Sequence, residues 1–157
     1  MRTPIRRHAP RLAAAALVLA SAWPALATLG EREETAARDA SAFGTTASRR
    51  ISTVRGASAV HEMRAGLNAV RQYAAADGTI FAVAWEGPVH PDLDTLLGSH
   101  AKAYRAAATA GTRTSRGPRR IVAGNLVVEF GGHGRSLQGR AYLTDAVPAG
   151  ASLDDLQ

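Results

Sequence analysis

The sequence predicts an α+β domain: an antiparallel sheet of about five strands, in the order β-β-β-α-β-β, with one helix packed on a face. Three observations lead to this fold class. The pair Asp77-Gly78 lies between two stretches of strand-forming residues, and it favours a hairpin because both turn positions tolerate positive φ. Between 91 and 108, large apolar residues recur at helical spacing. A glycine-rich turn at 131–134 separates two further alternating stretches, which indicates a second hairpin.

The first three strands are expected at 59–65, 69–75 and 79–85, with Gly66, Leu67 and Asn68 turning the chain between the first two. The third strand is apolar on both faces. Its two sets of side chains are Phe81, Val83 and Trp85, and Ile80, Ala82 and Ala84. A strand of this kind is typical of the centre of a sheet that is covered on both sides.

One helix is expected over 91–108. Pro91 suits the first helical position, and Asp92 and Asp94 complement the positive end of the helix dipole. The apolar stripe consists of Leu93, Leu96, Leu97, His100, Ala101 and Tyr104. Gly98 lies within this helix and costs it some stability. The last two strands follow at 121–130 and 136–143, after a polar loop.

Residues 1–27 have the pattern of a cleavable signal peptide. Four arginines and no acid precede a run at 12–22 that is apolar except for Ser21, and Ala25 and Ala27 occupy the small-residue positions that a signal peptidase reads. The run is shorter than the roughly 20 apolar residues that a membrane-spanning helix needs. We therefore expect a periplasmic or secreted protein, cleaved near Ala27, with no transmembrane span in the mature chain.

The mature chain is expected to have three parts. Residues 28–58 are rich in Ala, Thr, Ser, Arg and Glu, and a segment with so few large apolar groups predicts a flexible tether or a frayed helix. Residues 59–150 form the α+β domain. Residues 151–157 form a C-terminal tail that is irregular or a short helical turn.

Composition excludes several classes of protein. The chain has no cysteine, which excludes disulfides, thiol nucleophiles and a lipid-anchored N-terminal cysteine. The formal charge of +6 falls to +2 once the four arginines of 1–27 are removed, so a nucleic-acid partner is not expected. The many Arg, Ala and Gly residues beside a single Lys indicate a bacterium with GC-rich codons.

Two blocks of sequence resemble a known family. The run V-R-Q-Y-A-A-A-D-G-T-I-F-A-V-A-W-E-G-P at 70–88, followed by P-D-L-D-T-L-L-G at 91–98, is similar to the bacterial family of domain of unknown function 2844. The segments N-L-V-V-E-F-G-G-H at 125–133 and G-R-A-Y-L at 139–143 resemble its second half. The resemblance covers about 59–155 and departs from the expected pattern at His100-Ala101. It implies an exported protein and a shared fold, and it assigns no catalytic residue.

No motif for catalysis or for a cofactor is present. The four histidines outside the leader have none of the spacings of a metal site, and no nucleophilic serine motif or phosphate-binding loop occurs. We expect no cofactor and no metal. The remaining catalytic hypothesis is a small periplasmic hydrolase using Glu86, Asp92 or His133, of which the first two flank the Gly87-Pro88 turn. Structural roles at a helix start and at strand ends explain the acids more simply.

Two surfaces are candidates for binding. Trp85 and Glu86 precede a rigid turn, where an indole could form the wall of a groove, and His133 lies among glycines that let a ligand approach the backbone. A basic loop carries Arg113, Arg116, Arg119 and Arg120 and could contact an anionic surface such as lipid headgroups. A solvated loop is the simpler interpretation of these arginines.

These features favour a non-enzymatic function. We expect an exported bacterial envelope protein that binds a partner or assists an assembly, with the small periplasmic hydrolase as the alternative. The sequence identifies neither the partner nor the oligomeric state.

Overall fold

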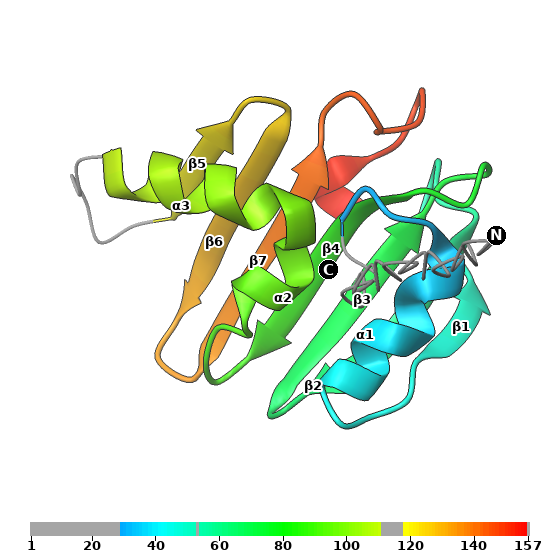
Figure 1. The fold of residues 1–157 in the computed structure, drawn as a ribbon, viewed down its shortest axis with the longest axis horizontal. Helices are drawn as coiled ribbons and strands as arrows, with labels where there is room; N and C mark the ends of the chain where they lie inside the picture. The colour runs from blue at the N-terminus through cyan, green and yellow to red at the C-terminus, as the bar shows by residue number, and fades with distance from the viewer. Residues whose placement is uncertain (1–28, 53, 111–117, 157) are drawn as a thin grey trace, which may run out of the picture.

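The chain forms a seven-stranded antiparallel sheet in the order β1-β2-β3-β4-β7-β6-β5 (Figure 1). The computed structural model describes residues 29–52, 54–110 and 118–156. The strands are β1 (Ser48–Ile51), β2 (Ala59–Ala65), β3 (Asn68–Ala74), β4 (Ile80–Gly87), β5 (Arg119–Ala123), β6 (Leu126–His133) and β7 (Ser136–Leu143). The α+β class and the antiparallel pairing are confirmed, but the sheet has seven strands and not about five. The strand expected over 121–130 is two strands, β5 and β6, joined by a turn at Gly124 and Asn125, and β1 was not expected.

Helices cover a single face of this sheet (Figure 1). Helix α1 (Ala36–Ala42) lies over the β1–β3 half, and α2 (Leu93–Leu97) and α3 (Ala101–Ala110) lie over the other half. Three short 3-10 turns complete the fold: η1 (Glu33–Thr35), η2 (Gly98–His100) and η3 (Leu153–Asp155). No helix of the described residues is long and apolar enough to cross a membrane. We call the uncovered side of the sheet the helix-free face.

The single helix expected over 91–108 is divided into α2 and α3. Gly98 ends α2 with φ of 49°, in the left-handed region that a glycine adopts at little cost. The chain then passes through η2 before α3 begins. At the other end, Asp92 caps α2, since its side chain accepts a hydrogen bond from the Asp94 backbone N–H at 3.0 Å.

The N-terminal segment, expected to be flexible over 28–58, instead forms part of the folded domain in its described residues. Leu29 is fully buried, and its backbone N–H donates to Leu96 O at 3.3 Å. Gly30 and Glu31 exchange backbone hydrogen bonds with Ile80 of β4, each 2.8 Å long. Helix α1 packs through Ala36 and Ala40, both with no exposed surface. Small side chains allow this helix to approach the sheet closely, which composition alone does not indicate.

Apolar side chains pack on both faces of the sheet. The helix-covered core includes Val70, Val83, Trp85, Leu96 and Leu126, with Leu29 from the N-terminal segment. The helix-free face carries a second cluster around Phe81, Tyr73, Val127 and Tyr142. The C-terminal segment, expected at 151–157 to be irregular or a short helical turn, contains the short 3-10 turn η3 and covers this cluster with the buried side chain of Leu156. The prediction of a central strand covered on both sides is confirmed for β4.

Candidate functional site

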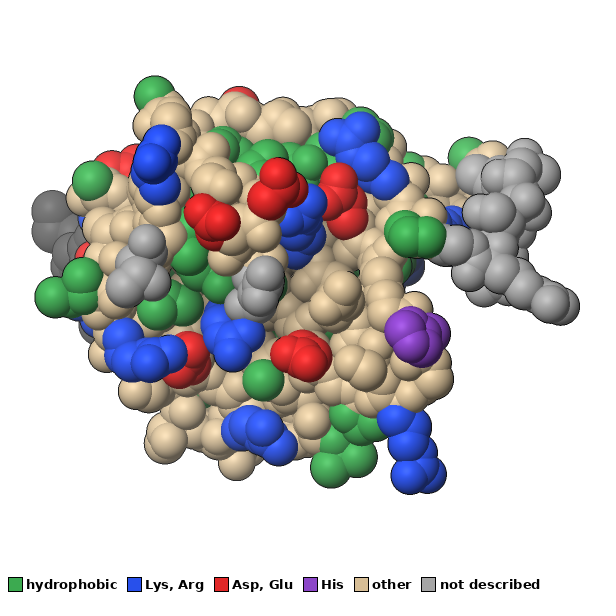
Figure 2. All heavy atoms as spheres, turned by 180° about the vertical axis from the view of Figure 1, so that it is seen from behind, with side chains coloured by type: hydrophobic (Ala, Val, Ile, Leu, Met, Phe, Trp, Pro, Cys, Tyr) green, Lys and Arg blue, Asp and Glu red, His purple; other side chains and the backbone are tan. Residues whose placement is uncertain are grey.

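A pocket of about 650 Å³ opens on the helix-free face, over β4, β7, β6 and β5. Glycines at 131, 132 and 139 leave backbone exposed along its floor, and the C-terminal segment forms one side. Its lining residues are Trp85, Glu86, Pro118, Arg119, Arg120, Glu129, Phe130, Gly131, Gly132, Gln138, Gly139, Arg140, Asp154 and Leu156. Acidic and basic side chains are interspersed over this face of the molecule (Figure 2).

The central charge of the pocket, Glu129, is held between two arginines. Strand register places Arg120 and Arg140 on either side of it. The Arg120 Nε donates to Glu129 Oε1 at 3.1 Å, and the Arg140 Nε donates to Glu129 Oε2 at 2.6 Å. Arg140 also donates to the carbonyl oxygen of Leu153, which ties the C-terminal segment to the sheet. Charge-assisted bonds of this kind fix both guanidinium groups in place.

Glu86 is the charged pocket residue that these bonds leave out. It lies in one row across the sheet with Gln138 of β7 and Gly131 of β6. Its side chain is exposed, and no described cation lies within ion-pair distance of its carboxylate. The pocket therefore combines the mutually paired charges of Glu129, Arg120 and Arg140 with an exposed carboxylate, that of Glu86, which has no ion-pair partner among the described residues.

Trp85 points to the opposite face, because successive side chains of a strand alternate. The indole is 2% exposed and packs edge-on against Phe130, with ring centroids 5.9 Å apart. Its Nε1 donates to His90 Nδ1 at 3.3 Å, and burial lowers the pKa of His90 below its usual value. The ring lies over Gly139, where an added Cβ would come within 2.3 Å of the indole. Trp85 is therefore a buried side chain that is nevertheless among the residues lining the pocket.

The structure does not gather the residues of the hydrolase hypothesis into one pocket. Of Glu86, Asp92 and His133, only Glu86 is among the pocket-lining residues. The Asp92 carboxylate is engaged at the start of α2, where it also accepts from Thr95 Oγ1 at 2.6 Å. His133 is exposed at the end of β6, beside the β6–β7 turn. Trp85 and Glu86 face opposite sides of the sheet, so the expected trio of Trp85, Glu86 and His133 is also divided.

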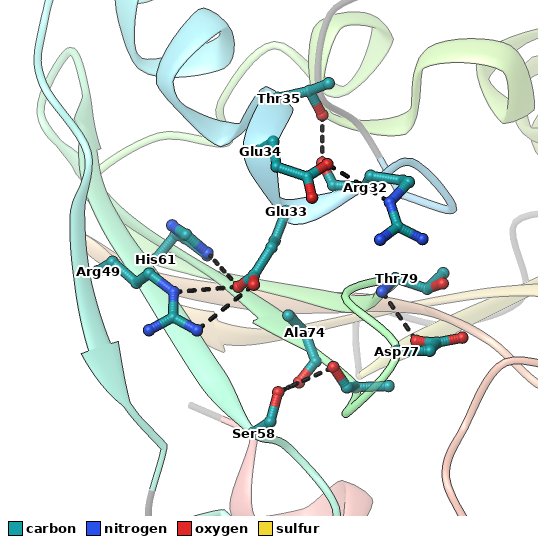
Figure 3. Close-up of polar contacts among 11 residues, drawn as sticks. Arg32, Glu33, Glu34, Thr35, Arg49, Ser58, His61, Ala74, Asp77 and Thr79 are labelled. Carbon is teal, nitrogen blue, oxygen red and sulfur yellow. Dashed lines mark hydrogen bonds and ion pairs between the residues drawn. The ribbon is translucent and has the colours of Figure 1, made fainter.

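A second polar cluster joins the N-terminal segment to the sheet (Figure 3). Glu33 Oε2 accepts from Arg49 Nε and contacts His61 Nε2, both at 3.1 Å. The hydrogen bond from Arg49 holds the pKa of the Glu33 carboxyl below its usual value, and the bond to the buried His61 adds to this effect. The three residues come from η1, β1 and β2, so sequence spacing gave no signal for their contact.

This cluster has the imidazole and the carboxylate of a proton-transfer pair, but its described residues offer no hydroxyl nucleophile for that pair to activate. Among the described residues, no serine or threonine hydroxyl is hydrogen-bonded to His61. Arg49 keeps Glu33 ionised, which favours a fixed ion pair over proton exchange. We therefore assign the cluster a structural role, as a latch between the N-terminal segment and strands β1 and β2.

Comparison with known proteins assigns the chain to a family. Residues 25–156 match the family described as Protein of unknown function (DUF2844). The chain belongs to this family. The match confirms the resemblance found in the strand and helix motifs, and it extends to the N-terminal segment that holds Leu29 and the latch. Searches of curated proteins and of solved structures returned no match.

The DUF2844 match includes every pocket residue and both binding surfaces expected from the sequence. Of the basic-loop arginines, Arg113 and Arg116 lie outside the described residues. Arg119 donates to the backbone oxygen of Ala108 in α3 at 3.0 Å, and Arg120 is bonded to Glu129. These two arginines are therefore engaged within the domain. The described part of the chain also holds no group of three or more metal-ligating side chains.

Proposed function

We propose that this DUF2844 chain is an exported bacterial envelope protein whose folded domain binds a protein partner, without catalysis, at the pocket on the helix-free face. The observation that carries the proposal is the pocket itself. It is about 650 Å³ in volume, which falls within the range of ligand pockets, and its polar groups are set by strand register.

The chemistry of the lining favours recognition over bond cleavage. The lining residues contain no serine, threonine, cysteine or histidine, so a hydroxyl or thiol nucleophile paired with a histidine base is absent among them. The carboxylate of Glu129 is engaged by both Arg120 and Arg140. Fixed charges and exposed glycine backbone can orient a bound segment by hydrogen bonds, as a binding surface requires.

Site-specific crosslinking in the producing bacterium tests the binding site. A photoreactive amino acid replaces Gln138, which is exposed within the pocket, or Lys102, which is exposed on α3 at the other face. We expect a discrete crosslinked adduct in the envelope fraction from position 138 and none from position 102. Equal adducts from both positions, or none from position 138, would contradict the proposed site.

Export is tested separately. We expect the protein in the periplasm or the medium to begin near Thr28, as read by mass spectrometry of the intact chain. Deletion of residues 2–27 should retain the protein in the cytoplasm. Recovery of the full-length chain from the cytoplasm, with no processed form elsewhere, would refute export.

A further inference from the structure

Resting on the proposed function, we infer that the pocket selects a partner segment carrying a lysine or arginine side chain, and that Glu86 is the residue that recognises this positive charge. The inference names the chemistry of the partner. It depends on which charged side chains of the pocket already have an ion-pair partner within the domain and which one has none among the described residues.

The pocket's cations on the helix-free face are both engaged inside the domain. Arg140 makes hydrogen bonds to Glu129 and to the Leu153 carbonyl, and it lies 3.5 Å from Asp154. Arg120 is bonded to Glu129 and to the Tyr142 hydroxyl, the latter at 3.5 Å. An incoming anion would meet the carboxylate of Glu129 between the two guanidinium groups, and that negative charge opposes its binding.

Arg119 adds no positive charge to the helix-free face of the pocket. Strand alternation places it on the helix-covered face, opposite Arg120, and its guanidinium donates to Ala108 O. On the helix-free face the lining therefore carries three carboxylates, from Glu86, Glu129 and Asp154, against two guanidinium groups. The excess is one negative charge. Asp154 is exposed as well, but it lies 3.5 Å from Arg140. Of the three carboxylates, only that of Glu86 has no ion-pair partner among the described residues.

The surroundings of Glu86 suit a polypeptide segment. Gln138 and Gly131 share its row across the sheet, so a side-chain amide and bare backbone lie beside the carboxylate. A few residues away, the same face already holds the C-terminal segment of the chain in a non-strand conformation. That segment is bound by a backbone carbonyl on Arg140 and by the buried side chain of Leu156. A partner segment lying alongside would place an ammonium or guanidinium group against Glu86.

Titration of the mature chain with short blocked peptides, followed by backbone amide NMR, tests this inference. The probes are Ac-Gly-Lys-Gly-NH2, the same peptide with norleucine, which keeps the side-chain length without the charge, and the same peptide with glutamate. We expect saturable shifts of the Gln138, Gly131 and Gly139 amides with the lysine peptide. Norleucine should bind about 3- to 5-fold more weakly, as befits one partly exposed ion pair, and glutamate more weakly still.

Two variants provide the control. Glu86→Gln keeps the size of a side chain that contacts no described cation, so the fold is retained, and it should lose the preference for lysine over norleucine. Glu34→Gln removes another exposed acid, from the N-terminal segment, and should keep that preference. Equal binding of the lysine and norleucine peptides, or an unchanged preference in Glu86→Gln, would overturn the inference. If Gln138 still crosslinks to a partner in cells, that result would leave the proposed binding function standing.

Discussion

The close contact between Trp85 and Gly139 makes a sharp prediction about stability. A Cβ at position 139 would lie 2.3 Å from Trp85 Cζ2 and 2.8 Å from the Glu129 carbonyl oxygen. The indole is 2% exposed, so it cannot move into solvent. Overpacking of a rigid core typically costs about 1–3 kcal/mol, and two contacts this short place Gly139→Ala near 3 kcal/mol. For a domain of this size that corresponds to a fall in Tm of roughly 10 °C.

Gly131→Ala is the matched control. Both glycines lie in the β6–β7 hairpin, and neither has a positive φ. A Cβ at position 131 would meet Gln138 Nε2 at 3.5 Å, which is an ordinary contact. We expect Gly131→Ala to be neutral or stabilising by about 0.5 kcal/mol, because alanine reduces the entropy of the unfolded chain.

Urea unfolding followed by far-UV circular dichroism measures both variants. A double-mutant cycle with Trp85→Leu isolates the clash, since a leucine side chain does not extend to the indole Cζ2 position. Gly139→Ala should cost clearly less in the Trp85→Leu background than in the wild-type chain. If Gly139→Ala is as stable as Gly131→Ala, or equally costly in both backgrounds, the assignment of Trp85 as a fixed anchor is refuted.

Three further predictions concern the latch, the indole contact and the C-terminal segment. Glu33→Gln should lower the free energy of unfolding by about 1 kcal/mol at pH 7. Because Arg49 lowers the pKa of Glu33, the difference between the variant and the wild-type chain should shrink as pH falls below 4.5. A difference that is constant with pH would contradict the latch. Burial lowers the pKa of His90 in the folded chain, so as pH drops below 6.5 the unfolded chain takes up the imidazole proton before the folded chain does. The free energy of unfolding should therefore fall below pH 6.5. The fall should be accompanied by a change in Trp85 fluorescence that is absent in His90→Gln. Leu156→Ala should cost about 2–3 kcal/mol in urea unfolding, and a cost under 0.5 kcal/mol would show that the segment is not packed.

The sequence predicted the central strands and hairpins because their patterns are local. The 59–65, 69–75 and 79–85 strands correspond closely to β2, β3 and β4, and Gly78 turns the chain with φ of 84°. A frayed helix was one alternative for 28–58, but the packing of α1 on the sheet was not predicted, since it depends on alanines that are buried only by the facing strands. Strand β1 is exposed along its whole length and has no alternating pattern to detect.

Only part of the candidate site was predicted, because most of its contacts join residues that are distant in the sequence. Glu86 was singled out from its place before the Gly-Pro turn, and it does line the pocket. Its neighbours come from the pairing of β4 with β7 and of β7 with β6. Glu86 is more than 40 positions away from both Gln138 and Gly131, so no local spacing indicated that they lie beside it. The inward direction of Trp85 likewise depended on which face the helices cover.

Under the proposed export, the docking of Leu29 would set an order of events. Leu29 is fully buried, and Gly30 is bonded to β4. If the leader is removed after Ala27, a single residue separates the cut bond from this anchor. A peptidase needs extended, accessible chain on both sides of the bond it cleaves, which a seated Leu29 does not supply. Maturation would then come before the N-terminus closes onto the sheet, and resistance to added protease would develop only after the leader has gone.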